Sequence, residues 1–203
     1  MNQRLIWNFE FSSKKKSLPA ELFVENEQDN LKWESRFFWP FDQIIVLRNL
    51  DESLLDIANY QQKHREDSYF LLPDTNYNIK QRRNELLYKP QHQKTAHAIG
   101  FGSKINLGDL SGYSENEAQL EEIKQRIEQE GIRVFVKKEA FIYKFPTKPS
   151  IKLELARIDV LDNIYFSACI EGKSRQGVET VSKYLLGEHV SCDYVTFLQN
   201  ILK

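Results

Sequence analysis

Apolar and polar residues alternate with a period of two along most of this chain, the pattern of β-strands with one face in a core and one in water. In residues 31–39, for example, Lys32, Glu34 and Arg36 share one face of the run. A continuously apolar stretch at 43–48 predicts a more buried strand. The pattern predicts strands at residues 4–11, 31–39, 43–48, 69–72, 78–88, 132–145, 151–160 and 164–171.

Helical patterns occupy fewer segments. Residues 114–130 predict a charged helix, because Ser114 stands at an N-cap position, Glu117 follows three residues later, and Gly131 ends the run. Residues 51–64 predict a second helix with acidic residues in its first turn. From about residue 175, the apolar spacing predicts C-terminal helices packed on the outside. The polar, glycine-containing residues 91–106 predict a loop.

The order of these elements predicts the fold class. No internal repeat, low-complexity tract or Gly/Ser linker divides the chain, so we expect residues 1–203 to form a single domain. Many strands with few interposed helices favour an α+β fold. We expect a strongly curved antiparallel sheet, or a β-barrel-like tunnel, with flanking helices.

Composition narrows the classes of partner. The 203 residues include 28 Lys and Arg against 29 Asp and Glu, which predicts no general attraction to nucleic acid or to a membrane. Cys169 and Cys192 lack the spacing of a disulfide framework or a zinc site, which indicates a reducing compartment. The sequence has no recognisable leader and no segment apolar enough to span a bilayer, so we expect a cytoplasmic protein.

Several charged side chains share faces of the predicted strands. Lys80 and Arg82 are two residues apart and share a face, Arg83 points to the other side, and Lys89 joins them if a return strand begins near Glu85. If the strands surround one lumen, basic and acidic side chains converge there and require a polyanion, a divalent cation, or both. Alternation alone does not show that the strands close, so ordinary solvated faces are the alternative.

The order of short motifs resembles the CYTH family of triphosphate tunnel metalloenzymes. The motifs are an N-terminal NFEF, a K-x-R strand followed by a lysine in IKQRRNELLYK, a later basic strand in VFVKKEAF, and two closing strands in IKLELA and ACIEG. The resemblance implies a tunnel in which basic residues bind a triphosphate and glutamates hold Mg²⁺ or Mn²⁺. By position, it implies phosphate contacts at Lys80, Arg82, Lys89 and Lys137, and metal ligands at Glu10, Glu154 and Glu171.

Four positions depart from the family pattern. Asn8 and Cys169 stand where the family has glutamates, Ser12 where it has a lysine, and Glu139 where it has a basic residue. Loss of carboxylates weakens a site for a hard cation, and a thiol is a poor ligand for Mg²⁺. Two functions therefore remain open: a metal-dependent phosphohydrolase for a triphosphate-containing or related phosphorylated compound, or a non-catalytic module that binds an anionic metabolite or polyphosphate.

Other features receive ordinary interpretations. We expect Arg36 to be a surface arginine, with a position facing the tunnel as the alternative. We expect Arg157 and Asp159 to form a surface pair, and the aromatic residues at 37–39 to pack in the core. The four histidines accompany no nucleophile signature and receive no role. A protein-docking role for the charged helix 114–130 is a third, weaker alternative, because such a charge pattern is typical of any solvated helix.

Overall fold

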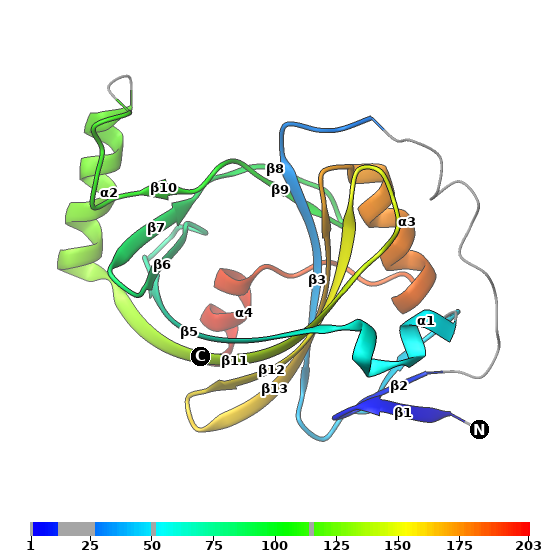
Figure 1. Cartoon of the computed structure of the whole chain (residues 1–203). Coiled ribbons are helices and arrows are strands. Elements are labelled where there is room, and N and C mark those ends of the chain that lie inside the picture. The colour runs from blue at the N-terminus through cyan, green and yellow to red at the C-terminus, as the bar shows by residue number, and fades with distance from the viewer. Residues whose placement is uncertain (1, 12–26, 50–51, 114–115) are drawn as a thin grey trace.

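The computed structural model describes residues 2–11, 27–49, 52–113 and 116–203. Within these residues, ten strands form one antiparallel sheet in the order β10-β7-β6-β5-β11-β12-β13-β3-β9-β8, which curls into a half-barrel (Figure 1). The α+β class predicted from the alternating pattern is confirmed. The strands are β3 (Lys32–Pro40), β5 (Gln61–Leu71), β6 (Asn78–Arg82), β7 (Glu85–Lys89), β8 (Gln91–Lys94), β9 (Ile99–Phe101), β10 (Ile105–Asn106), β11 (Ile132–Lys144), β12 (Ile151–Val160) and β13 (Asn163–Gly172).

The two ends of this sheet are joined by residues 85–106, which we call the bridging ribbon. Strands β7 and β10 lie at one end of the sheet and β8 and β9 at the other. Along the chain, however, only Pro90 separates β7 from β8, and residues 102–104 separate β9 from β10. At this bend the Gly102 amide donates to the Pro90 carbonyl over 2.9 Å. The two covalent crossings bring the ends of the half-barrel together around a central space (Figure 1).

A second, three-stranded sheet packs on the outer face. It consists of β1 (Gln3–Ile6), β2 (Phe9–Phe11) and β4 (Ile45–Leu47). The predicted strand 4–11 is therefore a hairpin, in which Trp7 has the positive φ of 47° required by the tight turn. Phe9, Leu47 and the helix α3 (Arg175–Leu186) share one core with the outward residues of β12 and β13.

The last helix, α4 (Tyr194–Ile201), lies on the inner face, and the expectation that both C-terminal helices pack outside is corrected. Tyr194, Val195 and Leu198 pack against inward residues of β5, β11 and β12, including Val136 and Ile158. The segment that leads into α4 runs beside β3, where the Cys192 amide donates to the Arg36 carbonyl. This part of the inner face is apolar, because α4 covers it and removes it from water.

The remaining helices lie on the outside. Helix α2 (Glu117–Glu130) ends before Gly131 as predicted, and it covers the outer side of β6 and β7 through Leu120, Ile123 and Ile127. Ser114, its predicted cap, lies outside the described residues.

Among the described residues, no helix combines the length and the apolar character needed to cross a bilayer.

Two predicted segments have different structures. The predicted helix at 51–64 is only α1 (Glu52–Leu55) and the 3₁₀ helix η2 (Ile57–Asn59), and β5 begins at Gln61. Strand β5 pairs with β11 from Gln61 to Leu71, so long-range backbone pairing overrides the local helical pattern. The predicted loop 91–106 contains the three short strands β8, β9 and β10. The polar, exposed side chains of β8 are typical of an edge strand, which conceals its extended conformation from a hydrophobicity pattern.

Candidate functional site

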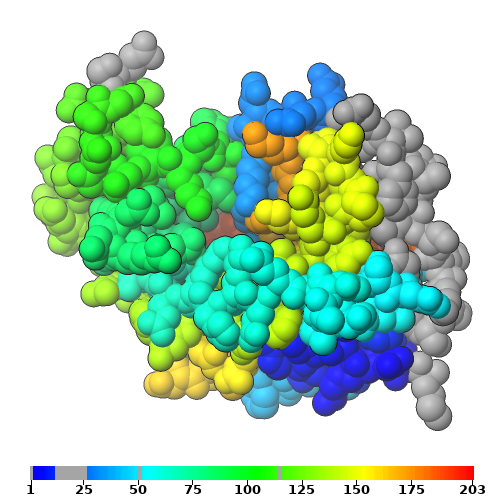
Figure 2. All heavy atoms as spheres, in the orientation of Figure 1, coloured from blue at the N-terminus to red at the C-terminus, as the bar shows by residue number. Residues whose placement is uncertain are grey.

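A pocket of about 320 Å³ opens inside the curled sheet. In Figure 2 it is the hollow between the green segments, which include the bridging ribbon, and the blue and yellow strands, with red atoms of the C-terminal segment at its bottom. Its lining is strongly basic, although the formal charge of the whole chain is only −1. The charged lining residues are Lys32, Arg36, Arg65, Lys80, Arg82, Lys89, Lys104, Lys138 and Lys173, with Glu34, Glu154 and Glu171.

Five of the seven site residues predicted from the sequence line this one pocket. They are Lys80, Arg82, Lys89, Glu154 and Glu171. They come from β6, β7, β12 and β13, and the pleat points each of them inward. Arg83, which the alternation excludes, lies in the hairpin turn after β6 with a φ of 55° and does not line the pocket.

The other two predicted residues lie elsewhere. The Lys137 side chain is 60% exposed on the outer face of β11, where it pairs with Glu66. Its neighbour Lys138, 9% exposed, takes the inward position, because consecutive residues of a strand point to opposite faces. Glu10 belongs to β2 in the small sheet and pairs with Arg4, so it does not join Glu154 and Glu171. The expected locations of Lys137 and Glu10 are thereby corrected.

The structure adds residues that the sequence analysis did not select. Lys32, Glu34 and Arg36 project from β3 into the pocket, and Arg36, expected on the surface, is buried. The K-x-E-x-R alternation does reveal that these three share a face. It does not reveal that this face is the inner one. Arg157 and Asp159 form an ion pair of 2.8 Å on the outer face of β12, as predicted.

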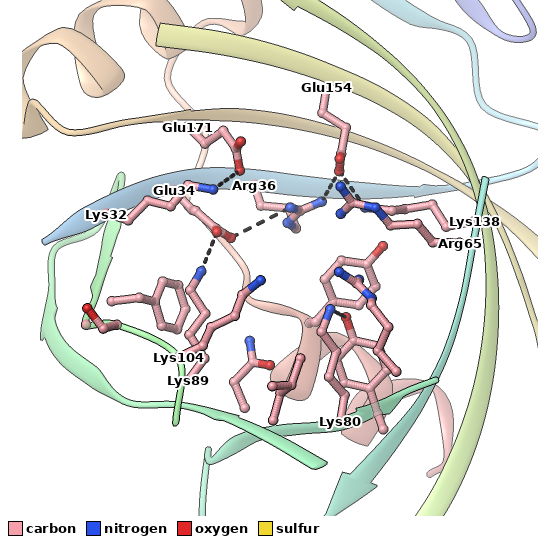
Figure 3. Close-up of a pocket in the computed structure, with 18 of the residues that line it drawn as sticks. Lys32, Glu34, Arg36, Arg65, Lys80, Lys89, Lys104, Lys138, Glu154 and Glu171 are labelled. Atoms are coloured by element: carbon pink, nitrogen blue, oxygen red, sulfur yellow. Dashed lines mark hydrogen bonds and ion pairs between the residues drawn. The ribbon is translucent and has the colours of Figure 1, made fainter. Parts of the chain in front are cut away.

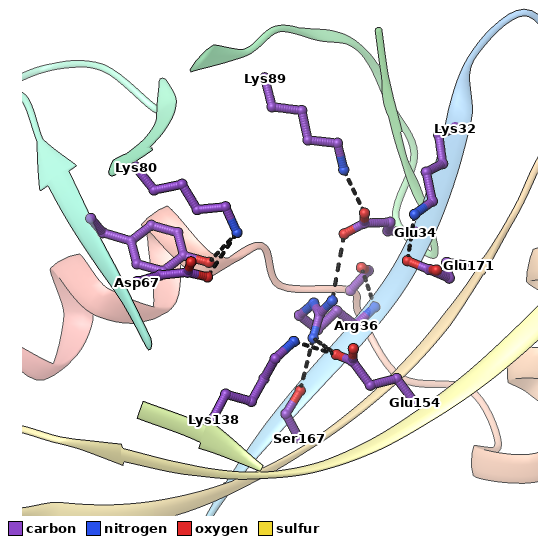
Figure 4. Close-up of polar contacts among 12 residues, drawn as sticks. Lys32, Glu34, Arg36, Asp67, Lys80, Lys89, Lys138, Glu154, Ser167 and Glu171 are labelled. Carbon is purple, nitrogen blue, oxygen red and sulfur yellow. Dashed lines mark hydrogen bonds and ion pairs between the residues drawn. The ribbon is translucent and has the colours of Figure 1, made fainter. Parts of the chain in front are cut away.

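Glu154 bridges two buried cations at the pocket floor. Its Oε1 accepts from Lys138 Nζ at 2.8 Å and from Arg36 Nη1 at 3.1 Å (Figure 4). Burial alone would raise the pKa of Glu154, but the charges of Lys138 and Arg36 hold that pKa well below its ordinary value. Ser167 adds a contact of 3.4 Å to Arg36. The three charges thus tie β3, β11 and β12 together.

A pair of carboxylates lies towards the bridging ribbon. Glu34 and Glu171 are cross-strand partners in β3 and β13. Lys89 pairs with Glu34 at 2.5 Å, and Lys32 pairs with Glu171 at 2.7 Å. Burial alone would raise the pKa of Glu34, but Lys89 and its other cationic neighbours hold that pKa well below the ordinary value. The lysines therefore offset the repulsion that two adjacent carboxylates would otherwise suffer.

Asp67 of β5 holds the two basic side chains of β6. Its carboxylate accepts from Arg82 Nε and Nη2, both at 2.6 Å, and from Lys80 Nζ at 3.0 Å. Burial alone would raise the pKa of Asp67, but these donors lower it to about 2. Desolvation lowers the pKa of Lys80 to about 7, although Asp67 acts in the opposite direction. Sequence analysis missed Asp67, since an aspartate on a strand is ordinarily read as solvated.

The described residues do not form the three-glutamate metal site implied by the family resemblance. Glu10 is in the other sheet, and Glu154 and Glu171 are each engaged by basic side chains. No group of three or more His, Cys, Asp or Glu side chains in the described part of the chain is placed to hold a metal ion. Cys169 is buried, and burial raises the pKa of its thiol, which therefore stays protonated. The donor set fits an anion better than a cation.

The comparisons with known proteins give little further information. No protein-family model matches the sequence, and no curated protein matches it. One solved structure, a protein from Bacillus halodurans described as a “putative adenylate cyclase”, aligns with 86% of this chain and 100% of its own chain. The identity is 8% and the TM-score is 0.42. A similarity of this size does not establish a shared function.

Proposed function

We propose that this protein binds a small polyphosphate-bearing anion in the basic pocket of its curled sheet. The observation that supports this proposal is the charge of the lining: nine Lys and Arg side chains against three Glu, in a chain with no overall positive charge. Lys and Arg are the side chains that pair with phosphate oxygens. A volume of about 320 Å³ lies at the lower end for ligand pockets, which favours a compact ligand.

The aromatic rings of the pocket favour recognition of the phosphates over recognition of an organic group. Lys89 Nζ lies 3.9 Å from the centre of the Phe101 ring. Tyr69 and Tyr194 stack on each other at 5.1 Å, while Lys80 and Arg36 lie over the two rings at 5.2 and 4.8 Å. The three rings have cationic partners and are at most 6% exposed, so they offer little surface for a nucleobase to stack on. We therefore expect inorganic tripolyphosphate to bind at least as well as a nucleoside triphosphate.

Hydrolysis by a CYTH-like mechanism is the second candidate. The adjacent carboxylates of Glu34 and Glu171 favour it, because Mg²⁺ is commonly held by one or two carboxylates together with substrate phosphates. Their present ion pairs with Lys89 and Lys32 weigh against it. Membership of the CYTH family and dependence on Mg²⁺ or Mn²⁺ remain predictions, since Asn8 and Cys169 replace two carboxylates of the family pattern.

Calorimetric titration of the full chain with tripolyphosphate tests the binding proposal. We expect saturable binding at one site that weakens as ionic strength rises. Replacing Lys89→Met is expected to weaken it, whereas Lys137→Met is the matched control, because Lys137 lies on the outer face. Absence of binding by the unmodified chain at low ionic strength would refute the proposed function.

A phosphate-release assay separates binding from hydrolysis. The protein is incubated with tripolyphosphate, thiamine triphosphate or ATP, with Mg²⁺ or Mn²⁺ and without metal. Metal-dependent release that is lost in Glu171→Gln would support the phosphohydrolase. Intact tripolyphosphate, together with a raised unfolding temperature, would support the binding module, because a ligand of the native state raises its apparent stability.

A further inference from the structure

The cations of the pocket fall into two classes. Six have a carboxylate partner: Lys32, Arg36, Lys80, Arg82, Lys89 and Lys138. Arg65, Lys104 and Lys173 also line the pocket, but no carboxylate of the described residues pairs with them. The sequence motifs select only residues of the first class. A paired cation can contact a ligand only if its ion pair with the carboxylate is shared or broken. An unpaired cation can contact a ligand without losing an existing interaction.

Lys104 occupies a distinctive position among the unpaired cations. It lies in the crossing between β9 and β10, next to the bend at Pro90 and Gly102 that joins the ends of the sheet. Its side chain is exposed at the pocket mouth beside Lys89 (Figure 3). Partial desolvation, followed by the charges of Arg82 and Lys89, lowers the pKa of Lys104. The fold places this lysine near other cations, and no carboxylate of the described residues pairs with it.

Arg65 approaches the same space from another wall. It projects from β5 and is half-buried, and Figure 3 shows it beside Lys138, across the pocket from Lys89 and Lys104. The Tyr194 hydroxyl is another polar group of the pocket lining without a partner among the described residues. It belongs to a pocket-lining residue that is only 6% exposed, and it has no hydrogen-bond partner among the described residues. Buried hydroxyls in folded proteins are almost always paired, so the lack of a protein partner is unusual for this group.

We propose that Arg65 and Lys104 are the primary ligand contacts of the pocket and bind one polyanion from two of its walls. The paired cations lie between them and stabilise the arrangement of the strands. This inference rests on the proposed binding function and deepens it. A ligand that reaches both side chains needs anionic groups at both of its ends. The two residues therefore select an extended polyanion, such as tripolyphosphate, over a single phosphate.

The test compares four proteins by calorimetric titration: the unmodified chain, Arg65→Met, Lys104→Met, and the outer-face control Lys137→Met. Each is titrated with tripolyphosphate and with orthophosphate. We expect each pocket variant to bind tripolyphosphate roughly tenfold or more weakly, since a hydrogen bond to a charged group is lost. The preference for tripolyphosphate over orthophosphate should also shrink. The control should bind like the unmodified chain.

Urea unfolding of the same proteins distinguishes ligand contact from structural damage. Because no carboxylate of the described residues pairs with Arg65 or Lys104, both variants should unfold at the urea concentration of the unmodified chain or above it. If the unmodified chain binds tripolyphosphate and both variants bind it equally well, the inference is wrong and the proposed function stands. Equal weakening in Lys137→Met would also overturn the inference, since charge at any position would then suffice. If the unmodified chain does not bind, the proposed function fails, and the inference fails with it.

Discussion

Asp67 controls the charge and the orientation of two basic side chains in the pocket. It receives both donors of the Arg82 fork and the Lys80 ammonium, yet it stands behind them and does not itself line the pocket. A carboxylate in this position has two opposite effects on an incoming anion. It reduces the positive charge of the site, and it fixes the geometry and protonation of the cations that bind.

We expect Asp67→Asn to weaken tripolyphosphate binding by roughly tenfold, although it makes the pocket more positive. The reason is that Asp67 raises the pKa of Lys80, so without it more of the lysine becomes neutral, and Arg82 loses its fixed orientation. Calorimetric titration at neutral pH measures the effect, and a thermal melt checks that the variant folds. Tighter binding in a folded variant would show that Asp67 only diminishes the charge of the pocket.

Lys80 should link anion binding to proton uptake. Burial lowers its pKa to about 7; the facing charges are Asp67 on β5, Arg82 on β6 and Lys138 on β11. Above pH 7 the free protein therefore holds a largely neutral Lys80, and a bound anion raises its pKa and draws in a proton. Affinity should consequently fall as the pH rises from 7 to 9.

Titrations in buffers of different ionisation enthalpy measure this proton uptake. In Lys80→Arg the guanidinium stays charged throughout this range, so its uptake should be smaller by up to about one proton per ligand. Protonation of the ligand itself is common to both proteins and cancels in the comparison. Equal uptake by the two proteins would exclude Lys80 as the group that titrates.

At the scale of elements, charged residues of the pocket also connect strands of the sheet. Glu154 of β12 connects Arg36 of β3 with Lys138 of β11, and β3 is not hydrogen-bonded to either of these strands. The outer face of β12 carries a contrasting pair, Arg157 and Asp159, at 38% and 40% exposure. One strand thus provides a buried and an exposed ion pair for direct comparison.

Glu154→Gln is expected to lower the free energy of unfolding by about 3 kcal/mol, because it leaves the buried Lys138 without its carboxylate partner and leaves Arg36 only the longer contact of 3.7 Å to Glu34. Asp159→Asn, the control on the same strand, should cost less than about 1 kcal/mol, because water screens the exposed pair. Urea unfolding followed by circular dichroism measures both changes. Similar losses in the two variants would mean that the Glu154 network contributes little to holding the strands together.

At the scale of the whole molecule, charge is separated between inside and outside. The chain as a whole has slightly more acidic than basic residues, yet its inner pocket is strongly basic. That the protein has no general attraction to nucleic acid or to an anionic membrane stays a prediction, which an outer surface without a positive excess favours. Under the proposed function, selectivity depends on which anions fit through the mouth of the pocket. That residues 1–203 constitute a single domain stays a prediction.

The sequence alone determined which residues share a face, because the pleat of a strand is a local property with a period of two. On that basis Lys80 and Arg82 share a face and Arg83 is excluded, and the structure places these residues accordingly. Lys89 joins them because β7 begins at Glu85, the condition that the sequence analysis set. The same period did not reveal which face is the inner one. The run IRVFVKKEAFIYK has apolar residues on both faces, with Val134 and Val136 inside and Phe135 outside, so Lys137 and Lys138 were equally compatible with the pattern.

Only the tertiary structure decided which faces of the strands line the pocket and which residues meet there. The closure at Pro90, the insertion of α4 into the half-barrel and the separation of Glu10 into another sheet all depend on contacts between residues far apart in the chain. The pairing of the cations likewise depends on strands that meet only in the folded state. A charge pattern in sequence cannot distinguish Lys89, which has a carboxylate partner, from Lys104, which has none among the described residues. The sequence therefore selected Lys80, Arg82 and Lys89 as candidate contacts, whereas the unpaired Arg65 and Lys104 became candidates only through long-range packing.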